Sequence, residues 1–477
     1  MEIEYWVWMC AILLASYFCL INFMWRLNEW YYNMKLKKKQ YPLPPGHLGW
    51  PLIGNMLAFV KDFSSGHPDS FITNLVSKNG RTGIYKTHLF GSPSIIICEA
   101  DMCRRVLLDY ETFKIGYPKS TMEVIGFKSF WSSVEKEHKG LKRLVSALTM
   151  GHNTLEMYLP RIEDIVINSM EEISSMNHPV EFLKEMKSIS FDIIISIIMG
   201  SYNKNILTKI ENSFSDVFAA LYCMPIDLPG FAFHKGLKAR KKLVKLIQPI
   251  VEERRLMIKN GEKTKDKDLL DILLEARDED GVVLAGVEEP AYGIMWSLIY
   301  LTKHPHILKK AKEEQEEIIK ARPSTQKQLS YKEIKQMVYL SQVINEMLRV
   351  VGLNFALFRE ATKDVNMNGY IIPNGWKVLT WSRAIHHEPT YYSNPDEFNP
   401  SRWDDHKAKV GTFIPFGAGS MHCPASDLAK PEIFVFLHYF LLNYRLERVN
   451  PECPITCLPL SKPIDNCLSK VIKVSSA

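Results

Sequence analysis

A glycine-rich loop that ends in a cysteine is the segment of this 477-residue sequence best suited to metal chemistry. Phe416, Gly417 and Gly419 lead into Cys423, which a helix-like run follows. A thiol at a helix N-terminus has a lowered pKa, and glycines let the backbone lie against a flat macrocycle. The pattern therefore favours Cys423 as a thiolate ligand to a heme iron, a ligand that promotes O–O cleavage. A cysteine without such surroundings is more often a small buried hydrophobe.

Two charged segments upstream of this loop could form a buried cluster. Glu346 and Arg349 are three residues apart, so they share one face of a predicted helix and can pair. Arg402, in the segment FNPSRW, could join them. Each signal is common alone, and a surface pair of this kind has little energetic worth. Their order and spacing ahead of the cysteine loop make the combination specific.

The elements that must position these residues are mostly helical. The segments LEMYLPRIEDIVINSMEEISSM and HPHILKKAKEEQEEIIKA are amphipathic at helical spacing. Short strand-like runs, GIYKTHLF and PSIIIC, occur early in the chain. Further strands are expected late, around turn signals at 368–369 and 374–375. We therefore expect residues 56–477 to form one body that is mainly α with small β-sheets.

The N-terminus predicts where the protein lies. Residues 5–25 carry no charge and have aromatic side chains at both ends, and about 20 apolar residues span a bilayer as a helix. Glu2 and Glu4 precede this run and Arg26 follows it, so the positive-inside rule leaves the body on the cytoplasmic side. A cleaved signal peptide would need a basic start and a small-residue cleavage site. We therefore predict a single membrane anchor over residues 1–27.

A basic and proline-rich segment, residues 28–55, follows the predicted anchor. Pro42, Pro44, Pro45 and Pro51 fix φ and cannot continue a helix, so the segment is expected to act as a stiff, extended joint.

Composition adds two limits. The net charge of +6 is too small to indicate a nucleic-acid partner. The nine cysteines are irregularly spaced, which argues against a disulfide framework and for a reducing compartment.

Taken together, the proline segment, the Glu346–Arg349 pair, FNPSRW and the loop FIPFGAGSMHC resemble the cytochrome P-450 family, across essentially the whole chain. Longer stretches, such as LPGFAFHKGLKARKKL, are similar to plant oxidases of the ent-kaurenoic acid oxidase and beta-amyrin 11-oxidase group. The resemblance implies the P-450 prism fold preceded by one transmembrane helix, at the endoplasmic reticulum membrane. It also implies heme b, with NADPH electrons arriving through NADPH-cytochrome P-450 reductase. The implied activity is hydroxylation of an apolar terpenoid with O2, the substrate being a triterpenoid such as beta-amyrin or a diterpenoid.

The resemblance also implies roles for individual residues. Cys423 matches the axial ligand of the heme iron, and the structural triad that supports the heme pocket corresponds to Glu346, Arg349 and Arg402. The positions that reach heme propionates correspond to Arg359, His138 and Lys142. A solvated helix face is an equally good interpretation of the last two.

The distal side of the site departs from the family pattern. The family expects a long helix with an A-G-x-[DE]-T motif. Ala285, Gly286 and Glu288 fit it, but Glu289 stands at the threonine position and Pro290 follows at once. This removes an oxygen-activating hydroxyl, and a proline inside a helix costs about 3 kcal/mol or more. Roughly four turns of about 5.4 Å each are also missing from the first half of this helix, which is expected to start late or not to span the heme.

Further departures lie around the cysteine loop. Met421 replaces an arginine, Pro431 is expected to interrupt the following helix, and Ala425 for glycine is a milder change. Two interpretations stay open. One is an active monooxygenase in which Glu288 or Glu289 relays protons in place of the threonine. The other is a degenerate P-450-like protein that folds, with or without heme, but does not activate oxygen, because the distal helix is truncated and lacks its threonine. A membrane-tethered interaction protein would require the cysteine loop to be accidental.

Overall fold

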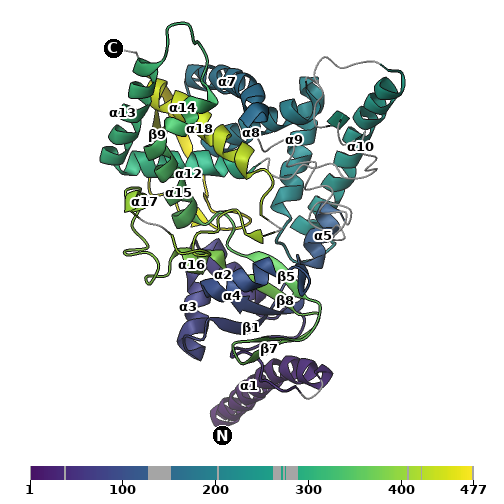
Figure 1. Ribbon diagram of the computed structural model, residues 1–477. Coiled ribbons are helices and arrows are strands. Elements are labelled where there is room, and N and C mark those ends of the chain that lie inside the picture. Colours follow the sequence, from purple (N-terminus) through teal and green to yellow (C-terminus); the bar gives the residue numbers. More distant parts are fainter. Residues whose placement is uncertain are drawn as a thin grey trace. The chain divides into compact units, whose positions relative to one another are not determined.

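The computed structural model describes most of the chain, and Figure 1 shows its ribbon. The described residues are 2–36, 39–126, 152–200, 203–261, 270–271, 274, 288–405, 408–419 and 422–474. The chain divides into a first unit, Met1–Pro118 with Ala356–Ala384, and a second unit, Lys119–Phe355 with Ile385–Ala477.

The first unit is built on a five-stranded sheet with the strand order β1-β2-β8-β5-β3. The pair β2–β8 is parallel and the other pairs are antiparallel. The strands are β1 (Ile84–Leu89), β2 (Ser92–Ile97), β3 (Phe113–Ile115), β5 (Leu357–Ala361) and β8 (Lys377–Thr380). A separate hairpin joins β6 (Val365–Met367) to β7 (Tyr370–Ile372).

Turn chemistry explains this hairpin. Asn368 and Gly369 both adopt positive φ, 50° and 84°, as the predicted Asn-Gly turn requires. The early strand predictions are likewise confirmed by β1 and β2.

The helices of the first unit are α1 (Glu2–Lys35), α2 (Met56–Ser64), α3 (Pro68–Asn79) and α4 (Ala100–Leu108). A core of aromatic rings packs α2 and α3 against the sheet. The rings of Phe59 and Phe63 are stacked with centroids 4.2 Å apart, and Phe71 stacks on the fully buried Trp381 at 5.9 Å. Such pairs add to the free energy of simple area burial.

Helix α1 continues further than the sequence predicts. Residues 28–35, expected to belong to an extended joint, are helical, because no proline occurs before Pro42. Among the described residues, we find no helix whose length and apolar character suffice to cross a bilayer.

The second unit is mostly helical, as predicted. Its helices are α5 (Lys119–Ile125), α7 (His152–Ser175), α8 (Phe182–Met199), α9 (Lys204–Ala219), α10 (Ala232–Lys259), α12 (Glu289–Lys303), α13 (Pro305–Ala321), α14 (Tyr331–Gln336), α15 (Val338–Val351), α17 (Arg402–Asp405) and α18 (Ser426–Asn443). One sheet has the order β4-β12-β9, from Val180–Glu181, Leu468–Lys473 and Tyr444–Arg448. The short strands β10 (Ile455–Thr456) and β11 (Lys462–Pro463) pair separately, and α16 (Ser382–His386) joins the two units along the chain.

Helix α12 lies in the centre of the second unit, between α8, α15 and α18. It is buried along almost its whole length. Gly293 allows a close approach, since a Cβ added there would lie 2.8 Å from Cδ1 of Ile433 in α18.

Two prolines that were expected to disrupt helices, Pro290 and Pro431, lie within α12 and α18. Pro290 lies in the first turn of α12, where its missing N–H is not needed. Pro431 lies within the continuous helix α18, so the expected interruption of that helix is wrong. It is the sixth residue of α18, so the carbonyl that loses its partner is that of Asp427, in the first turn.

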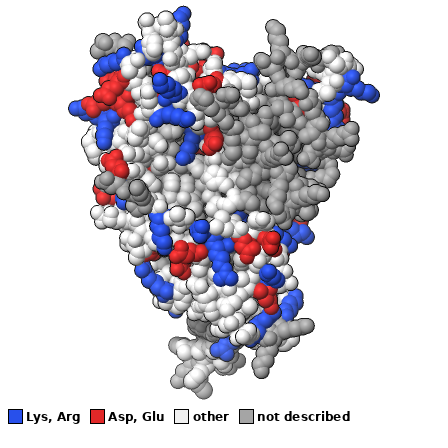
Figure 2. All heavy atoms as spheres, viewed as in Figure 1, with Lys and Arg blue, Asp and Glu red and all other residues white. Residues whose placement is uncertain are grey.

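The surface carries charges of both signs. In the view of Figure 2, basic and acidic side chains are interspersed over the described residues rather than gathered in one field. This distribution agrees with the small net charge of +6.

Candidate functional site

The loop before α18 is folded tightly around Cys423. The backbone N–H of Cys423 donates to the carbonyl of Phe416 at 2.9 Å, closing the loop on itself. Gly417 and Gly419 adopt left-handed φ values of 75° and 68°, which favour glycine at these two positions. The loop therefore has the backbone conformation that its glycine spacing suggested.

Cys423 lies three residues before the first residue of α18 and is partly exposed. A helix N-terminus favours negative charge, so this position suits a thiolate. Lys430, on the second turn of α18, lies with its Nζ 5.5 Å from the centroid of the Phe416 ring. The sulfur is therefore carried by a well-defined loop at the positive end of a helix.

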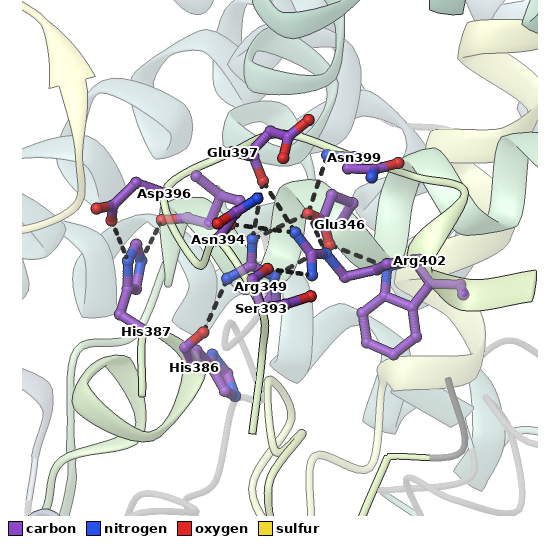
Figure 3. Close-up of polar contacts among 12 residues, drawn as sticks. Glu346, Arg349, His386, His387, Ser393, Asn394, Asp396, Glu397, Asn399 and Arg402 are labelled. Atoms are coloured by element: carbon purple, nitrogen blue, oxygen red, sulfur yellow. Dashed lines mark hydrogen bonds and ion pairs between the residues drawn. The ribbon is translucent and has the colours of Figure 1, made fainter. Parts of the chain in front are cut away.

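The structure brings Glu346, Arg349 and Arg402 into one buried cluster (Figure 3). Arg349 forms a bidentate pair with Glu346, with Nη2···Oε1 at 2.9 Å and Nε···Oε2 at 3.0 Å. Nε of Arg402 donates to the same Oε1 at 2.9 Å. The Glu346 carboxylate also accepts bonds from the Asn399 N–H at 3.1 Å and the Trp403 indole at 3.0 Å. One carboxylate thus compensates two arginines.

A chain of hydrogen bonds runs from this cluster to the cysteine loop. Nη1 of Arg349 donates to the carbonyl of His386 at 2.8 Å (Figure 3). The His386 ring accepts a bond from the N–H of Ile414 at 3.1 Å, and the Ile414 carbonyl accepts from Gly417 at 3.1 Å. Sequence reasoning missed His386, because it lies in a segment without a motif and both of its partners are distant in sequence.

Arg359 lies in the first unit, in the middle of β5, and is only 5% exposed. Its Nη1 donates to the carbonyl of Phe358 at 3.0 Å. Among the described residues, no carboxylate pairs with it. Burial lowers the pKa of its guanidinium, and a buried cation without a counter-charge is costly. An anionic group beside Arg359 would remove this cost.

Comparison with known proteins decides the family. The model of the family described as cytochrome P-450 matches residues 44–468. The chain belongs to the cytochrome P-450 family.

Named relatives of this P-450 include plant terpenoid oxidases. Beta-amyrin 11-oxidase of Glycyrrhiza uralensis is 60% identical, covering 98% of this chain and 99% of that protein. Ent-kaurenoic acid oxidase 2 of Arabidopsis thaliana is 47% identical over 94% of each. The solved structure of the retinoic acid-bound cyanobacterial protein CYP120A1 superposes with a TM-score of 0.79 at 25% identity, covering 91% of this chain and 100% of that one. The mainly helical P-450 fold and the resemblance to this group of oxidases are confirmed.

Members of the family are monooxygenases that hold a heme iron and draw electrons from NAD(P)H through a reductase. Each unit, taken by itself, offers a residue whose chemistry suits heme b. Cys423 offers a thiolate on a glycine-lined loop, and Arg359 is a buried cation in need of an anion such as a propionate. His138, Lys142 and Met421 lie outside the described residues.

Glu288 and Glu289, the two residues predicted for the distal side, have different surroundings. Oε2 of Glu288 forms an ion pair with Lys187 of α8 at 2.5 Å, and its Oε1 accepts from Ser215 of α9 at 2.9 Å. Oε2 of Glu289 has no hydrogen-bond partner among the described residues. Burial raises the pKa of Glu289 to about 7. Glu288 is therefore held by an ion pair and a hydrogen bond, while the carboxyl of Glu289 titrates near neutral pH.

A second buried acid in this P-450 was not predicted from sequence. Glu432 of α18 is fully buried and accepts a hydrogen bond from Ser190 of α8. Its Oε2 has no partner among the described residues, and burial raises its pKa to about 8. The only sequence signal is one acidic residue within the otherwise apolar run PEIFVFL.

Proposed function

We propose that this P-450 hydroxylates an apolar terpenoid, with O2 and electrons from NADPH-cytochrome P-450 reductase. In that reaction one oxygen atom enters a C–H bond and the other leaves as water, consuming two electrons and two protons. Relatives at 60% and 47% identity, named for beta-amyrin and for ent-kaurenoic acid, support a triterpenoid or diterpenoid substrate. The observation that carries the proposal is the Cys423 loop, closed on Phe416 and placed at the N-terminus of α18.

The bound heme would supply oxygen activation, and the protein's own residues would support it. Cys423 would hold the iron through its sulfur. Glu346, Arg349 and Arg402 would fix the segment that precedes the cysteine loop, through the carbonyl and ring of His386. Arg359 would neutralise a propionate. Glu289 would hold a transferable proton on its carboxyl, in place of the missing threonine.

The same proposal includes a location. Residues 5–25 are uncharged, and Arg26 and Lys35 follow them on α1. We propose that this part of α1 anchors the protein in the endoplasmic reticulum membrane, with the body on the cytoplasmic side. Alkaline carbonate extraction of expressing microsomes tests this: an anchored chain stays in the pellet, and a chain released to the supernatant contradicts the anchor.

A second candidate, a P-450 that binds heme but does not activate oxygen, is favoured by the start of α12. This helix begins at Glu289, and the two residues at its start, Glu289 and Pro290, carry no hydroxyl. The two candidates differ in turnover and not in heme binding, so one preparation can separate them.

The experiment uses microsomes that contain the full chain and a plant reductase. Reduction under carbon monoxide should give a red-shifted thiolate-type Soret band, and Cys423→Ala should abolish it. Beta-amyrin and ent-kaurenoic acid, each with NADPH, should then be assayed by mass spectrometry for a product 16 mass units heavier than the substrate. A Soret band without any product from a terpenoid panel supports the second candidate. A wild-type preparation without the band contradicts both.

A further inference from the structure

Lys430 is the only Lys or Arg in the stretch that contains the cysteine loop and α18. No other residue of either type occurs between Val410 and Tyr444. The loop itself carries Met421 at the position where the family pattern has an arginine. Any permanent positive charge on this stretch therefore comes from Lys430.

The ammonium group of Lys430 does not form the ion pair that its position on α18 would allow. Asp427 precedes it by three residues, a spacing at which opposite charges on a helix can meet. Other helical lysines of this chain do reach an acid four residues away, within 4.0 Å, namely Lys119, Lys309 and Lys312. Among the described residues, Nζ of Lys430 makes neither an ion pair nor a hydrogen bond.

The Lys430 side chain packs on the cysteine loop instead. Its Nζ lies 5.5 Å from the centroid of the Phe416 ring, within the range of a cation–π contact. Burial lowers the pKa of the ammonium group, and the charge of Asp427 opposes this shift. Because a charge acts more strongly where water is excluded, a partly buried lysine has a larger effect on its surroundings than an exposed one.

Phe416 connects this cation to the residue proposed to bind iron. The carbonyl of Phe416 accepts the backbone N–H of Cys423 at 2.9 Å. The Phe416 ring also lies 6.3 Å from the ring of His422, the neighbour of Cys423 in sequence. A cation held on Phe416 is therefore held on the same turn that carries the sulfur.

A positive charge on this turn has a definite effect on a bound iron. Ferric iron accepts one electron from the reductase and becomes ferrous, and no bond forms or breaks, so the charge of the site falls by one. A nearby cation stabilises the more negative of the two states. The groups around the ligand sulfur are among the means by which a protein sets the reduction potential of an iron site.

We propose that Lys430 is a positioning residue of the cysteine loop, which packs on Phe416 and whose charge raises the reduction potential of the iron held by Cys423. The inference rests on the proposed ligation of heme iron by Cys423. With Met421 in the arginine position, Lys430 brings the only permanent positive charge of the loop and α18 to the site. A docking contact for the reductase is a poorer interpretation, since a lysine turned onto an aromatic ring offers less of its charge to a partner.

The test titrates the iron in the full chain without reductase, so that docking cannot contribute. The Soret band reports the ratio of ferrous to ferric iron while dithionite and mediator dyes set the potential. Lys430→Met removes the charge and keeps a long unbranched side chain, whereas Lys430→Arg keeps the charge and can still stack on Phe416. Lys310→Met is the matched control, because Lys310 also lies over a ring, that of Tyr339, at 4.0 Å, but belongs to α13.

At the midpoint potential of the wild type, Lys430→Met should show a ferrous-to-ferric ratio roughly threefold to tenfold lower, where tenfold corresponds to about 59 mV for one electron. Lys430→Arg and Lys310→Met should keep the wild-type ratio to within about twofold. An unchanged midpoint in Lys430→Met overturns the inference. An equal fall in Lys430→Arg also overturns it, because packing and not charge would then be responsible. If Lys430→Met binds no heme, Lys430→Gln is titrated in its place.

The inference and the proposed function fail in different ways. A wild-type protein without the thiolate-type Soret band under carbon monoxide overturns the iron ligation on which both depend. A band without any hydroxylated product overturns the hydroxylation alone, and the midpoint potential of Lys430→Met then still decides the role of Lys430.

Discussion

Ser190 of α8 donates a hydrogen bond to Glu432 of α18, and both residues are buried. The pair connects the helix that follows the cysteine loop with a helix that also packs on α12. Oε2 of Glu432 has no partner among the described residues. Because burial raises the pKa of this carboxyl to about 8, the buried group is neutral at physiological pH. Protonation of the Glu432 carboxyl thus removes the charge that would otherwise need an ion pair.

The first prediction is that Glu432 makes stability fall as pH rises from about 4.5 to about 8, and that this fall levels off above pH 8. Its pKa is about 8 in the folded protein and near 4.5 when exposed, so its contribution is fully present below pH 4.5 and is lost as pH rises through 8. At about 1.4 kcal/mol per pKa unit, the loss amounts to several kcal/mol. Glu432→Gln should match the wild type at pH 5 and exceed its melting temperature at pH 9. Equal pH slopes for the two proteins would contradict the assignment.

Ser190→Ala serves as the companion variant. The Ser190 hydroxyl stabilises the ionised form of Glu432, so its removal should raise that pKa further. Stability should then continue to fall at pH values where the wild-type curve has levelled off.

The second prediction concerns the carboxylate that serves two arginines. Glu346→Gln keeps the shape of the side chain but leaves Arg349 and Arg402 buried without their counter-charge. Removing one partner of a buried ion pair costs about 3–5 kcal/mol. Denaturant unfolding should show this loss, and pyridine hemochromogen assays should show less heme per chain.

Glu447→Gln is the matched control for that change. Glu447 pairs with Arg445 at the same 2.9 Å, but both side chains are exposed. Its loss should cost less than about 1 kcal/mol. A similar loss in the free energy of unfolding for Glu346→Gln and Glu447→Gln would contradict the larger contribution expected of the buried pair.

The third prediction separates Glu288 from Glu289, at the start of α12. If Glu289 supplies protons, turnover should fall as pH rises past about 7, the value to which burial raises its pKa, because the proton-bearing form disappears. Glu289→Gln should lower kcat by roughly 10²–10⁴ and remove this limb of the pH profile.

Glu288→Gln should behave differently. It weakens the ion pair with Lys187 and should lower thermal stability, but it should retain the alkaline limb of the pH profile. An alkaline limb that persists in Glu289→Gln would assign the proton to another group.

Local motifs predicted much of this molecule, because their chemistry is local. The spacing of Glu346 and Arg349 suits a helix face, and the glycines before Cys423 adopt the left-handed conformations that favour glycine. Amphipathic periodicity placed α7 and α13 to within a few residues, and alternation with turn residues placed β1 and β2.

The features that sequence reasoning missed depend on tertiary partners. His386 connects two motifs through its backbone carbonyl on one side and its imidazole Nε2 on the other, and both partners are distant in sequence. Glu432 reads as a helix residue of no special kind until Ser190 is placed against it. Pro431 looked disruptive because its position within the helix, early in α18, depends on where the cysteine loop ends. No proline interrupts α1 before Pro42, and its last turns are further held because Asn28, Glu29 and Tyr32 bond to other segments of the first unit.

The fourth prediction tests the contact between α1 and the proline segment. Asn28→Ala removes the donor for the carbonyls of Leu48 and Trp50 and leaves these groups unsatisfied, which costs about 1–3 kcal/mol. Opening of the segment 46–56 should become easier by the same amount, so its amides should exchange with deuterium about tenfold faster or more.

Ser16→Ala is the control on the same helix, because the Ser16 hydroxyl bonds within α1, to the carbonyls of Ile12 and Leu13. Mass spectrometry of the peptide that covers 46–56 should show faster exchange in Asn28→Ala and the wild-type exchange rate in Ser16→Ala. Unchanged exchange in Asn28→Ala would mean that α1 and the proline segment are held together by other contacts.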